Sequence, residues 1–392
     1  MRRTSGFTAA LIILSLQIAC GYRADHAELP AAKTSATGGQ SVGPMVRTYY
    51  IAADEVEWDY APTGTNVTFG RPFNAEEKWY MEPGPTRIGR RVKKALYREY
   101  TDATFKTLKP RPPEWQHLGS LGPLIRGQVG DTIRVVFRNN AKFPATVHPH
   151  GVFYDKRSEG APYNDGTTGK DRLDDGVPTG GTYTYEWPVP ERAGPTPNET
   201  TTALWMYHSH HDEVRDIQSG LLGVLIITRR GMARADGSPI DVDREIVAGF
   251  IEVDENASWY VEENVRKLAT EPDSVKITRG VFSLHAVHPS FDKYYRETIN
   301  GFSYGHTPGL TMKVGERVRW YMIASTGFEF HAPHWHGNVV TFGHMRTDIG
   351  MLLPMGMMVA DMVPDNPGRW MFHCHVANHF EMGMHALYDV ER

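Results

Sequence analysis

The sequence contains only two cysteines, Cys20 and Cys374, among 392 residues. If the N-terminal one is removed or modified, the folded part keeps a single thiol, which excludes an internal disulfide. The chain also lacks an excess of positive charge, since 42 Lys and Arg residues stand against 46 Asp and Glu residues. The formal net charge of -4 provides no basic surface, so nucleic-acid binding is not expected.

A long hydrophobic run is missing as well. The apolar stretch at residues 7–19 follows two arginines and is too short to span a bilayer comfortably. It predicts an export signal over residues 1–20, and therefore a periplasmic or extracellular protein. Ala19-Cys20 resembles a bacterial lipoprotein cleavage site, although Gln17 stands where Leu is usual. A lipid anchor at Cys20 and plain cleavage both stay open.

Glycine and proline are abundant, with 38 and 26 residues. Residues 21–44 are rich in Ala, Thr, Ser, Gly and Pro and have too little apolar content to pack, so they predict a flexible linker. From residue 45 onward the periodic stretches are short and alternating, as at residues 131–138 and 316–323. This pattern is typical of strands joined by turns and predicts an all-β protein.

The sequence layout repeats once. Val-Gly-Asp at 129–131 and Val-Gly-Glu at 314–316 each open a strand that leads to two His-rich stretches. A repeat of this kind indicates an internal duplication. It predicts two β-sandwich domains, at residues 45–232 and 243–392, joined by the turn-rich segment between them.

Histidines concentrate in four clusters. In a strand, residues two apart project from the same face, so each His-X-His pair presents two imidazoles side by side. Imidazole suits copper, iron and zinc, and paired spacing alone does not choose among them. A structural zinc site would need only four ligands and is usually rich in cysteine. The clusters are His148-Pro-His150-Gly, His208-Ser-His210, His331-Ala-Pro-His334-Trp-His336, and His373-Cys374-His375 with His379.

The cysteine makes the choice. Strand alternation turns Cys374 to the face opposite His373 and His375, so its thiolate belongs to a different metal from that of its neighbours. Two His, one Cys and a weak axial Met form the ligand set of a blue-copper electron-transfer centre. His331, Cys374, His379 and Met384 supply this set, with Met382 as the competing axial ligand. An electron that arrives at the sulfur-bound copper can then leave through the backbone of Cys374.

The order HxHG, HxH, HxxHxH and HCHxxxHxxxxM resembles that of the multicopper oxidase family. Residues 47–53, 57–62, 117–124 and 250–260 are also similar to the A-type cupredoxin domains of ceruloplasmin, hephaestin and the blood-clotting cofactors. The resemblance covers nearly the whole chain after the linker. It implies two cupredoxin-like Greek-key β-sandwich domains, with the type 1 copper in the second.

The resemblance also implies four copper ions per chain and the reduction of dioxygen to water with four electrons passed singly. The type 1 ligands are the set named above. The type 2 copper is expected at His148 and His334, and the type 3 pair at His150, His208, His210, His336, His373 and His375.

Two-domain members of this kind resemble small bacterial laccases, in which domain 1 of one subunit meets domain 2 of the next. Each half of this chain holds four of the eight oxygen-site histidines. We therefore expect a homotrimer with its copper clusters at the subunit interfaces.

Acidic residues suggest two further roles. Reduction of oxygen consumes protons, and Glu159 matches an acidic position of the family, although a solvated loop carboxylate is an equal interpretation. A calcium loop is implied by resemblance at Lys156 (through its carbonyl), Asp171, Asp174 and Asp175. The methionines at 351, 355, 357, 358 and 362 are interpreted as core filler rather than as a Cu(I) patch.

The leading functional hypothesis is a laccase-like oxidase that takes single electrons from phenols or aromatic amines, its small reducing substrates. The alternative is a metallo-oxidase acting on Cu⁺ or Fe²⁺. Ferroxidase members carry an acid immediately before the second type 1 His, and Asn378 stands there, which weakens the iron alternative. Copper nitrite reductase fits poorly because the first domain has no Cys, and a non-enzymatic A-domain protein would have lost most of the ligands.

Overall fold

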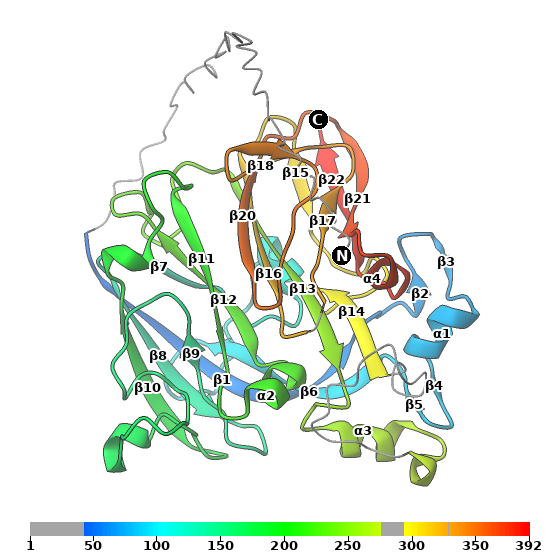
Figure 1. Cartoon of the computed structure of the whole chain (residues 1–392), viewed down its shortest axis with the longest axis horizontal. Helices are drawn as coiled ribbons and strands as arrows, with labels where there is room; N and C mark the ends of the chain where they lie inside the picture. Colours follow the sequence, from blue (N-terminus) through cyan, green and yellow to red (C-terminus); the bar gives the residue numbers. More distant parts are fainter. Residues whose placement is uncertain (1–42, 276–293, 328) are drawn as a thin grey trace, which may run out of the picture. The chain divides into compact units, whose positions relative to one another are not determined.

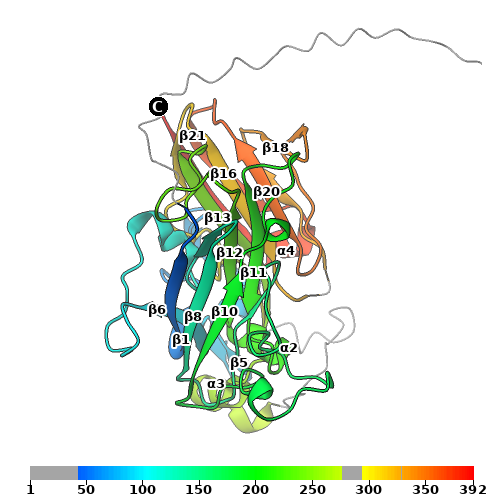
Figure 2. The same ribbon diagram turned by 90° about the vertical axis from the view of Figure 1, so that its left-hand side faces the viewer.

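The computed structural model describes residues 43–275, 294–327 and 329–392, and these residues form two β-sandwiches (Figure 1). The first sandwich has two four-stranded sheets. One runs in the order β10 (Thr182–Pro188), β8 (Thr132–Asn139), β1 (Val46–Asp59) and β6 (Arg91–Tyr100), and Figure 2 shows these strands side by side. The other runs in the order β7 (Ile125–Gln128), β12 (Leu222–Thr228), β11 (Thr202–His208) and β9 (His148–Pro149).

The second sandwich pairs a six-stranded sheet with a four-stranded one. The larger sheet has the order β14 (Tyr295–Ile299), β13 (Arg244–Asp254), β16 (Val318–Ala324), β20 (Met357–Met362), β18 (Val340–Phe342) and β19 (Met345–Thr347). The smaller one has the order β15 (Thr311–Lys313), β22 (His385–Glu391), β21 (Gly368–Cys374) and β17 (Pro333–Trp335). All these strands lie within the range predicted for the second domain.

The two sandwiches repeat the same connections. Strand β1 pairs in parallel with β8 as β13 pairs with β16, and β7 pairs in parallel with β12 as β15 pairs with β22. The antiparallel neighbours correspond as well, because β11 lies between β12 and β9 as β21 lies between β22 and β17. The internal duplication expected from the sequence is therefore present in the topology. The all-β class of two β-sandwich domains is confirmed.

Burial explains why these segments form strands. In β8 and β20 every second side chain is buried, as expected for a strand with one face on the core. Strands β12 and β16 are buried along their whole length, which fits their central places in the sheets. Large aromatic residues fill the two cores, among them Trp187 in the first sandwich and Trp320 and Trp335 in the second.

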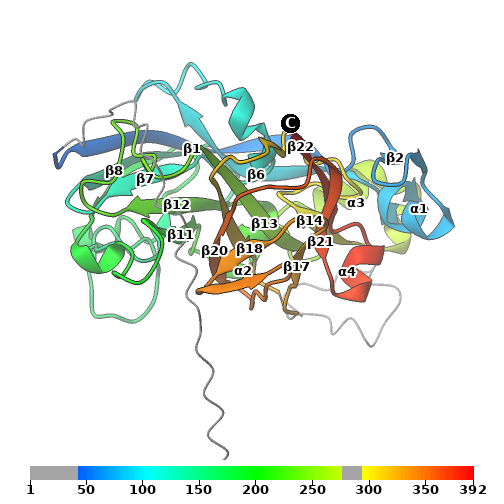
Figure 3. The same cartoon turned by 90° about the horizontal axis from the view of Figure 1, so that it is seen from above.

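Between β1 and β6 the chain makes an excursion that the sequence did not predict. It contains β2 (Thr65–Asn66), β3 (Arg71–Pro72), α1 (Ala75–Met81), β4 (Pro83–Gly84) and β5 (Arg87–Ile88). The excursion packs on the second sandwich beside α4 (Ala377–Glu381), as Figure 3 also shows. The Val67 N–H donates to the Tyr304 carbonyl at 3.0 Å, and the Phe69 and Phe380 ring centres are 6.4 Å apart.

The other helices are short and connect strands. They are α2 (Glu213–Ser219), α3 (Val261–Leu268) and the 3-10 turns Pro113–Leu118, Gly169–Arg172, Glu191–Ala193 and Pro272–Ser274. Within the described ranges, no helix has both the length and the apolar character needed to cross a membrane. The predicted export signal, the anchor at Cys20 and the linker up to residue 42 lie outside the described residues.

Candidate metal centres

The first site lies around the thiol of Cys374, at the end of β21. His331, Cys374 and His379 are buried, and their ligand atoms all lie within 4.8 Å of one another. Cys374 Sγ is 3.5 Å from His379 Nδ1 and 3.9 Å from His331 Nδ1. The Ala332 N–H donates to the same sulfur at 3.4 Å. A loop ahead of β17 and helix α4 thus bring two imidazoles to one thiol.

The protonation states of these side chains favour binding of a cation. Burial raises the pKa of Cys374 to about 11 and lowers the pKa of His331 to about 3, so both groups are neutral near pH 7. A thiolate in this pocket needs a cation beside it, and one sulfur with two imidazoles is a donor set that suits copper. Met384 is buried in the same core, and its backbone bonds to both Cys374 and His379. Met382 lies in the turn before it and stays the competing axial ligand.

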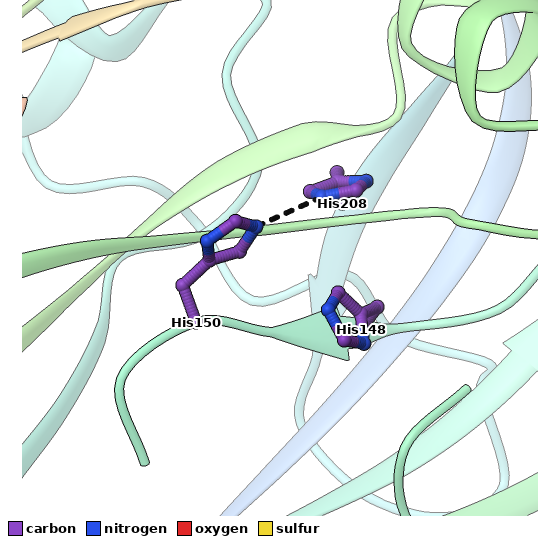
Figure 4. Close-up of side chains that lie close together, drawn as sticks. All are labelled: His148, His150 and His208. Carbon is purple, nitrogen blue, oxygen red and sulfur yellow. Dashed lines mark hydrogen bonds between the residues drawn. The ribbon is translucent and has the colours of Figure 1, made fainter. Parts of the chain in front are cut away.

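A second site lies in the first sandwich, where β9 and β11 place His148 directly opposite His208. The Nε2 atoms of His150 and His208 point toward one another at 3.0 Å (Figure 4). The Nδ1 atoms are used differently: that of His148 bonds to the Glu159 carbonyl at 2.6 Å, and that of His208 bonds to the Ser209 carbonyl at 3.1 Å. Because a carbonyl only accepts, Nδ1 carries the proton and Nε2 is left as the metal ligand.

The second sandwich repeats this arrangement. Strands β17 and β21 place His334 opposite His373, and the Nε2 atoms of His336 and His373 lie 3.0 Å apart. His334 Nδ1 bonds to the Asp348 carbonyl at 2.8 Å, and His373 Nδ1 bonds to the Cys374 carbonyl at 2.7 Å. Each sandwich therefore carries a pair of converging imidazoles. Main-chain carbonyls fix the orientation of one member of each pair, His208 or His373, and of the histidine opposite it, His148 or His334.

Burial and mutual repulsion keep these imidazoles uncharged. The pKa of His148 and that of His373 are each lowered to about 4, chiefly by desolvation, with smaller contributions from neighbouring histidines. Neutral imidazole is the form that binds metals, and two facing lone pairs are relieved by a cation placed between them. The residues present therefore fit copper at both pairs.

One more predicted ligand completes each set, His210 in the first sandwich and His375 in the second. The His210 ring lies 5.0 Å from that of His148, although its Nε2 is 3.5 Å from a Glu213 oxygen. The His375 ring lies 5.3 Å from that of His334. We call the resulting sets the first quartet, His148, His150, His208 and His210, and the second quartet, His334, His336, His373 and His375. Across the described residues, ring contacts occur within each quartet and none joins the two.

A glycine follows the last histidine of each HxH pair on β9 and β17. Gly151 and Gly337 have φ values of +78° and +72°, where side chains are strained. A Cβ at Gly151 would lie 2.1 Å from the Trp205 ring, and one at Gly337 would lie 2.5 Å from the Trp370 ring. Only glycine lets an indole close over the backbone behind each pair.

Glu159, the predicted proton donor, contacts the first quartet through its main chain. Its carboxylate is 2.6 Å from Lys156 Nζ and accepts from the Tyr163 hydroxyl at 3.0 Å. Its carbonyl is the acceptor that orients His148. The role of the carboxylate as a proton source stays a prediction.

The carboxylates expected to bind calcium do not converge. Asp175 pairs with Arg172 at 2.9 Å, and Asp174 is buried and accepts from the Gly160 N–H at 2.8 Å. Asp171 is exposed. Among the described residues these carboxylates form no group within 4.8 Å. The calcium site, with the Lys156 carbonyl as its expected main-chain ligand, therefore stays a prediction.

Three carboxylates near the Cys374 group were missed by sequence reasoning. Glu252 on β13 and Glu297 on β14 are opposite one another across the ladder, and both are buried. An oxygen of Glu329 lies 3.2 Å from His379 Nε2 and 3.3 Å from Asn378 Nδ2. Charged residues inside the otherwise apolar strands FIEVD and YRETI were the available signal, but their meeting depends on strand register.

The methionines of the 351–362 stretch divide between core and surface. Met358 and Met362 are buried in the second core, as expected of filler, whereas Met351 is 67% exposed.

Comparison with known proteins gives matches to multicopper oxidases. Two family models, both described as multicopper oxidase, match residues 118–231 and 268–392. The chain is 43% identical over 359 residues to human ferroxidase HEPHL1, covering 89% of this chain and 30% of the relative. It is 37% identical over 351 residues to mouse hephaestin (88% and 29%) and 38% identical over 365 residues to sheep ceruloplasmin (92% and 34%). The chain thus spans between 29% and 34% of the length of these relatives.

Solved structures share the fold at low sequence identity. A multicopper oxidase crystal structure aligns with a TM-score of 0.53 and 18% identity, over 88% of this chain and 89% of that one. Copper nitrite reductase from Nitrosomonas europaea aligns with a TM-score of 0.53 and 14% identity, over 88% and 94%. The two matching family models together cover more than half of the residues, and on this basis the chain belongs to the multicopper oxidase family.

Proposed function

We propose that this chain is a copper-dependent oxidase that collects single electrons at the Cys374 group and reduces dioxygen at a site built from the two quartets. The observation that carries this proposal is the place of Cys374 between His373 and His375, because the sulfur joins one group while its chain neighbours belong to another. When bound, copper would supply one-electron transfer at the sulfur and four-electron reduction of dioxygen to water at the histidines.

The ligand roles follow the family pattern and the pairing of Nε2 atoms. His331, Cys374 and His379, with Met384 as axial ligand, would hold the type 1 copper, and His148 with His334 the type 2 copper. For the type 3 pair, we assign His150 and His208 to one ion and His336 and His373 to the other, because these Nε2 atoms already converge. His375 would complete the first and His210 the second, each from the opposite quartet.

The chain's own residues prepare both sites. Carbonyl acceptors fix the tautomer of His148, His208, His334 and His373, and burial keeps water from the sulfur of Cys374. The His373 Nδ1–H donates to the Cys374 carbonyl, so a hydrogen bond joins the sulfur-bearing residue to an oxygen-site ligand in addition to the peptide bond. The two sites are therefore linked by one residue and oriented by one strand.

A complete oxygen site needs a second copy of the chain. The quartets lie on different sandwiches and make no ring contact in one chain within the described ranges. Apolar side chains are exposed close to both quartets. Phe153, which follows His150 in the chain, is 48% exposed. Ile349 forms a β-bridge with His334, and Leu353 shortly after it is 61% exposed. A head-to-tail contact that joins these faces closes into a ring of three when each contact turns the chain by a third of a full rotation. We therefore propose a homotrimer with an oxygen site at each interface.

For the electron donor we favour a reduced metal ion over a phenol or aromatic amine. Glu329 reaches the outward Nε2 of His379 at 3.2 Å, and Asn378 donates to the same carboxylate at 3.3 Å. Glu329 thus provides, from another segment, the acid that is missing at position 378, and the Asn378 side chain holds that acid by a hydrogen bond. The relatives named as ferroxidases point to the same donor class.

The buried pair Glu252 and Glu297 extends this acidic surface inward. Burial, with Glu252 and Glu329 nearby, raises the pKa of Glu297 well above its usual range. Its Oε2 has no hydrogen-bond partner in the described part of the chain. A divalent cation would relieve this arrangement, and carboxylate oxygens suit a hard ion such as Fe²⁺ better than Cu⁺. We therefore propose Fe²⁺ as the donor.

Oxygen uptake by copper-loaded protein tests the proposal with three donors: Fe²⁺, Cu⁺ and a phenolic dye. Uptake with Fe²⁺ should exceed the other two, and Glu297→Gln and Glu329→Gln should raise the KM for Fe²⁺ about tenfold or more while turnover of the dye is unchanged. Glu186→Gln, an exposed carboxylate on β10, is the matched control. If only the dye supports oxygen uptake, the donor is a phenol and the Fe²⁺ proposal is wrong. If no donor supports uptake, the oxidase proposal itself is wrong.

A further inference from the structure

We infer that Asp216, supported by Trp259, is the positioning residue that holds His208 and His210 of the first quartet in place. This inference rests on the proposed copper oxidase. Asp216 lies in α2 and is fully buried. One of its oxygens accepts from the Ser209 hydroxyl at 2.6 Å, and Ser209 is the residue between the two histidines. Its other oxygen accepts from the Trp259 indole at 2.8 Å.

The bonds of Ser209 extend this support to the other strand of the quartet. Its hydroxyl oxygen accepts from the Thr146 N–H at 3.0 Å. The Thr146 hydroxyl accepts in turn from the His210 N–H at 2.9 Å. Thr146 stands two residues before His148. A single carboxylate is therefore connected by hydrogen bonds to both chain segments that carry the first quartet.

The duplicated fold shows what this carboxylate replaces. Helix α4 follows β21 as α2 follows β11, and His373 pairs with His334 as His208 pairs with His148. Cys374 is therefore the counterpart of Ser209, and Ala332 that of Thr146. The correspondence holds in detail, because the Ala332 N–H donates to Cys374 Sγ as the Thr146 N–H donates to Ser209 Oγ. On the far side of the sulfur lie the ligands of the type 1 site. On the far side of the hydroxyl lies Asp216.

In the second sandwich, metal ligation at Cys374 would fix the strand that carries the paired histidines. Among the described residues of the first sandwich no group of metal ligands forms around Ser209, and the Ser209 hydroxyl donates to Asp216 instead. Burying a carboxylate among neutral donors costs free energy, and an apolar side chain would pack equally well without that cost. The three donors on Asp216, from Ser209, Trp259 and the Asp212 N–H, indicate that orientation is its role.

Trp259 belongs to the second half of the chain, and its hydrogen bond to Asp216 links that half to the first quartet. It follows β13, its ring stacks on Phe143 with centres 4.9 Å apart, and the Arg215 guanidinium lies 3.4 Å above it. Its indole N–H can therefore be removed by Trp259→Phe with the stacking kept. This substitution provides a mild variant beside the stronger changes Asp216→Asn and Ser209→Ala.

The test uses copper-loaded full-length protein, and the two sandwiches serve as references for each other. Asp216→Asn and Ser209→Ala should keep the blue thiolate absorption of the Cys374 site. They should weaken copper retention at the oxygen site about 10- to 100-fold and shift the paramagnetic resonance of its copper. Trp259→Phe should change the same signals in the same direction by less. Asp131→Asn, a buried carboxylate paired with Arg47 away from the quartets, should lower Tm without changing either signal.

Unchanged oxygen-site copper in Asp216→Asn and Trp259→Phe would overturn the inference, and so would equal loss of both copper signals in all three variants. Wild-type protein run alongside separates this result from failure of the proposed function. If wild type takes up no oxygen, Co²⁺ binding to the histidines still tests the positioning role, because it needs no oxidase chemistry. Equal Co²⁺ affinity in wild type and Ser209→Ala would then overturn it.

Discussion

Glu252 lies directly opposite Glu297 across the β13–β14 ladder, and both side chains are buried. Like charges placed opposite one another in a sheet destabilise it, and burial adds to the cost. Glu329, whose charge also acts on Glu297, lies 3.2 Å from His379 Nε2. The fold therefore retains an unfavourable pair of acids where we propose that a cation delivers electrons.

Replacing one acid of this pair should separate stability from function. We expect Glu297→Gln to stabilise the metal-free protein by about 1–2 kcal/mol, since it removes a buried acid without changing its shape. The same change should weaken Fe²⁺ binding. Urea unfolding of metal-free protein measures the first effect and Mn²⁺ titration, with Mn²⁺ as a stand-in, the second. A destabilised variant with unchanged Mn²⁺ affinity would contradict the proposed cation site.

Complementation between subunits tests the proposed sharing of the oxygen site. His150→Ala and His336→Ala should each abolish oxygen uptake when made alone. In a head-to-tail ring formed from an equal mixture, about a quarter of the interfaces join an intact first quartet to an intact second one. Co-refolding the two variants should therefore restore about a quarter of the wild-type activity. If each site is instead built within one chain, the mixture stays inactive.

Copper uptake should release protons from the thiol and not from the imidazoles. The pKa of Cys374 is raised to about 11 by burial, whereas burial lowers that of His331 to about 3, so only the thiol carries a proton to lose at pH 7. We expect about one proton released per type 1 copper. Calorimetric titration in buffers of different ionisation enthalpy measures this number, and Cys374→Ser should reduce it to about zero. Release of two or more protons would show that the imidazoles are charged beforehand.

Asp254 should make stability fall as the pH rises. Burial raises its pKa to about 6 in the folded protein, against about 3.9 when unfolded, so the folded state binds the extra proton between these values. The favourable contribution is complete below pH 4 and is lost by about pH 6. Asp254→Asn should remove up to about 3 kcal/mol of this dependence. Urea unfolding of both proteins at pH 4, 5, 6 and 7 measures the difference, and parallel curves would contradict it.

The glycines behind the histidine pairs should tolerate no side chain. Gly151→Ala adds a Cβ that would lie 2.1 Å from Trp205, and we expect a loss of oxygen-site copper with the blue absorption kept. Gly180→Ala is the matched control, since Gly180 has the same φ of +78° and nothing within 4 Å. The control should lose only about 1–2 kcal/mol of stability, the cost of placing alanine in the left-handed region. Equal Tm and copper content in both variants would show that the indole can move aside.

Local patterns predicted which side chains gather around the Cys374 thiol and within each quartet. Alternation along a strand was enough to separate Cys374 from His373, and the repeated His-X-His spacing was enough to expect two sandwiches of similar design. The same local reasoning took Asn378, in a position where ferroxidase members carry an acid, as evidence against iron as the donor. The neighbouring Glu329 lies close in the sequence to His331 but far from His379, so its contact with the outward imidazole depends on how loop and helix pack.

The sequence by itself determined the donor types and the face from which each one projects, because a period of two residues is a property of any extended chain. Tertiary structure alone decided which nitrogens converge, that Glu252 meets Glu297, and that Asp216 accepts from Ser209 in the first half, where the second half brings two imidazoles to the Cys374 thiol. Those relationships arise from strand register and from helices that return to the sheets. Their physical origin is the packing of two whole cores, which no short stretch of residues specifies.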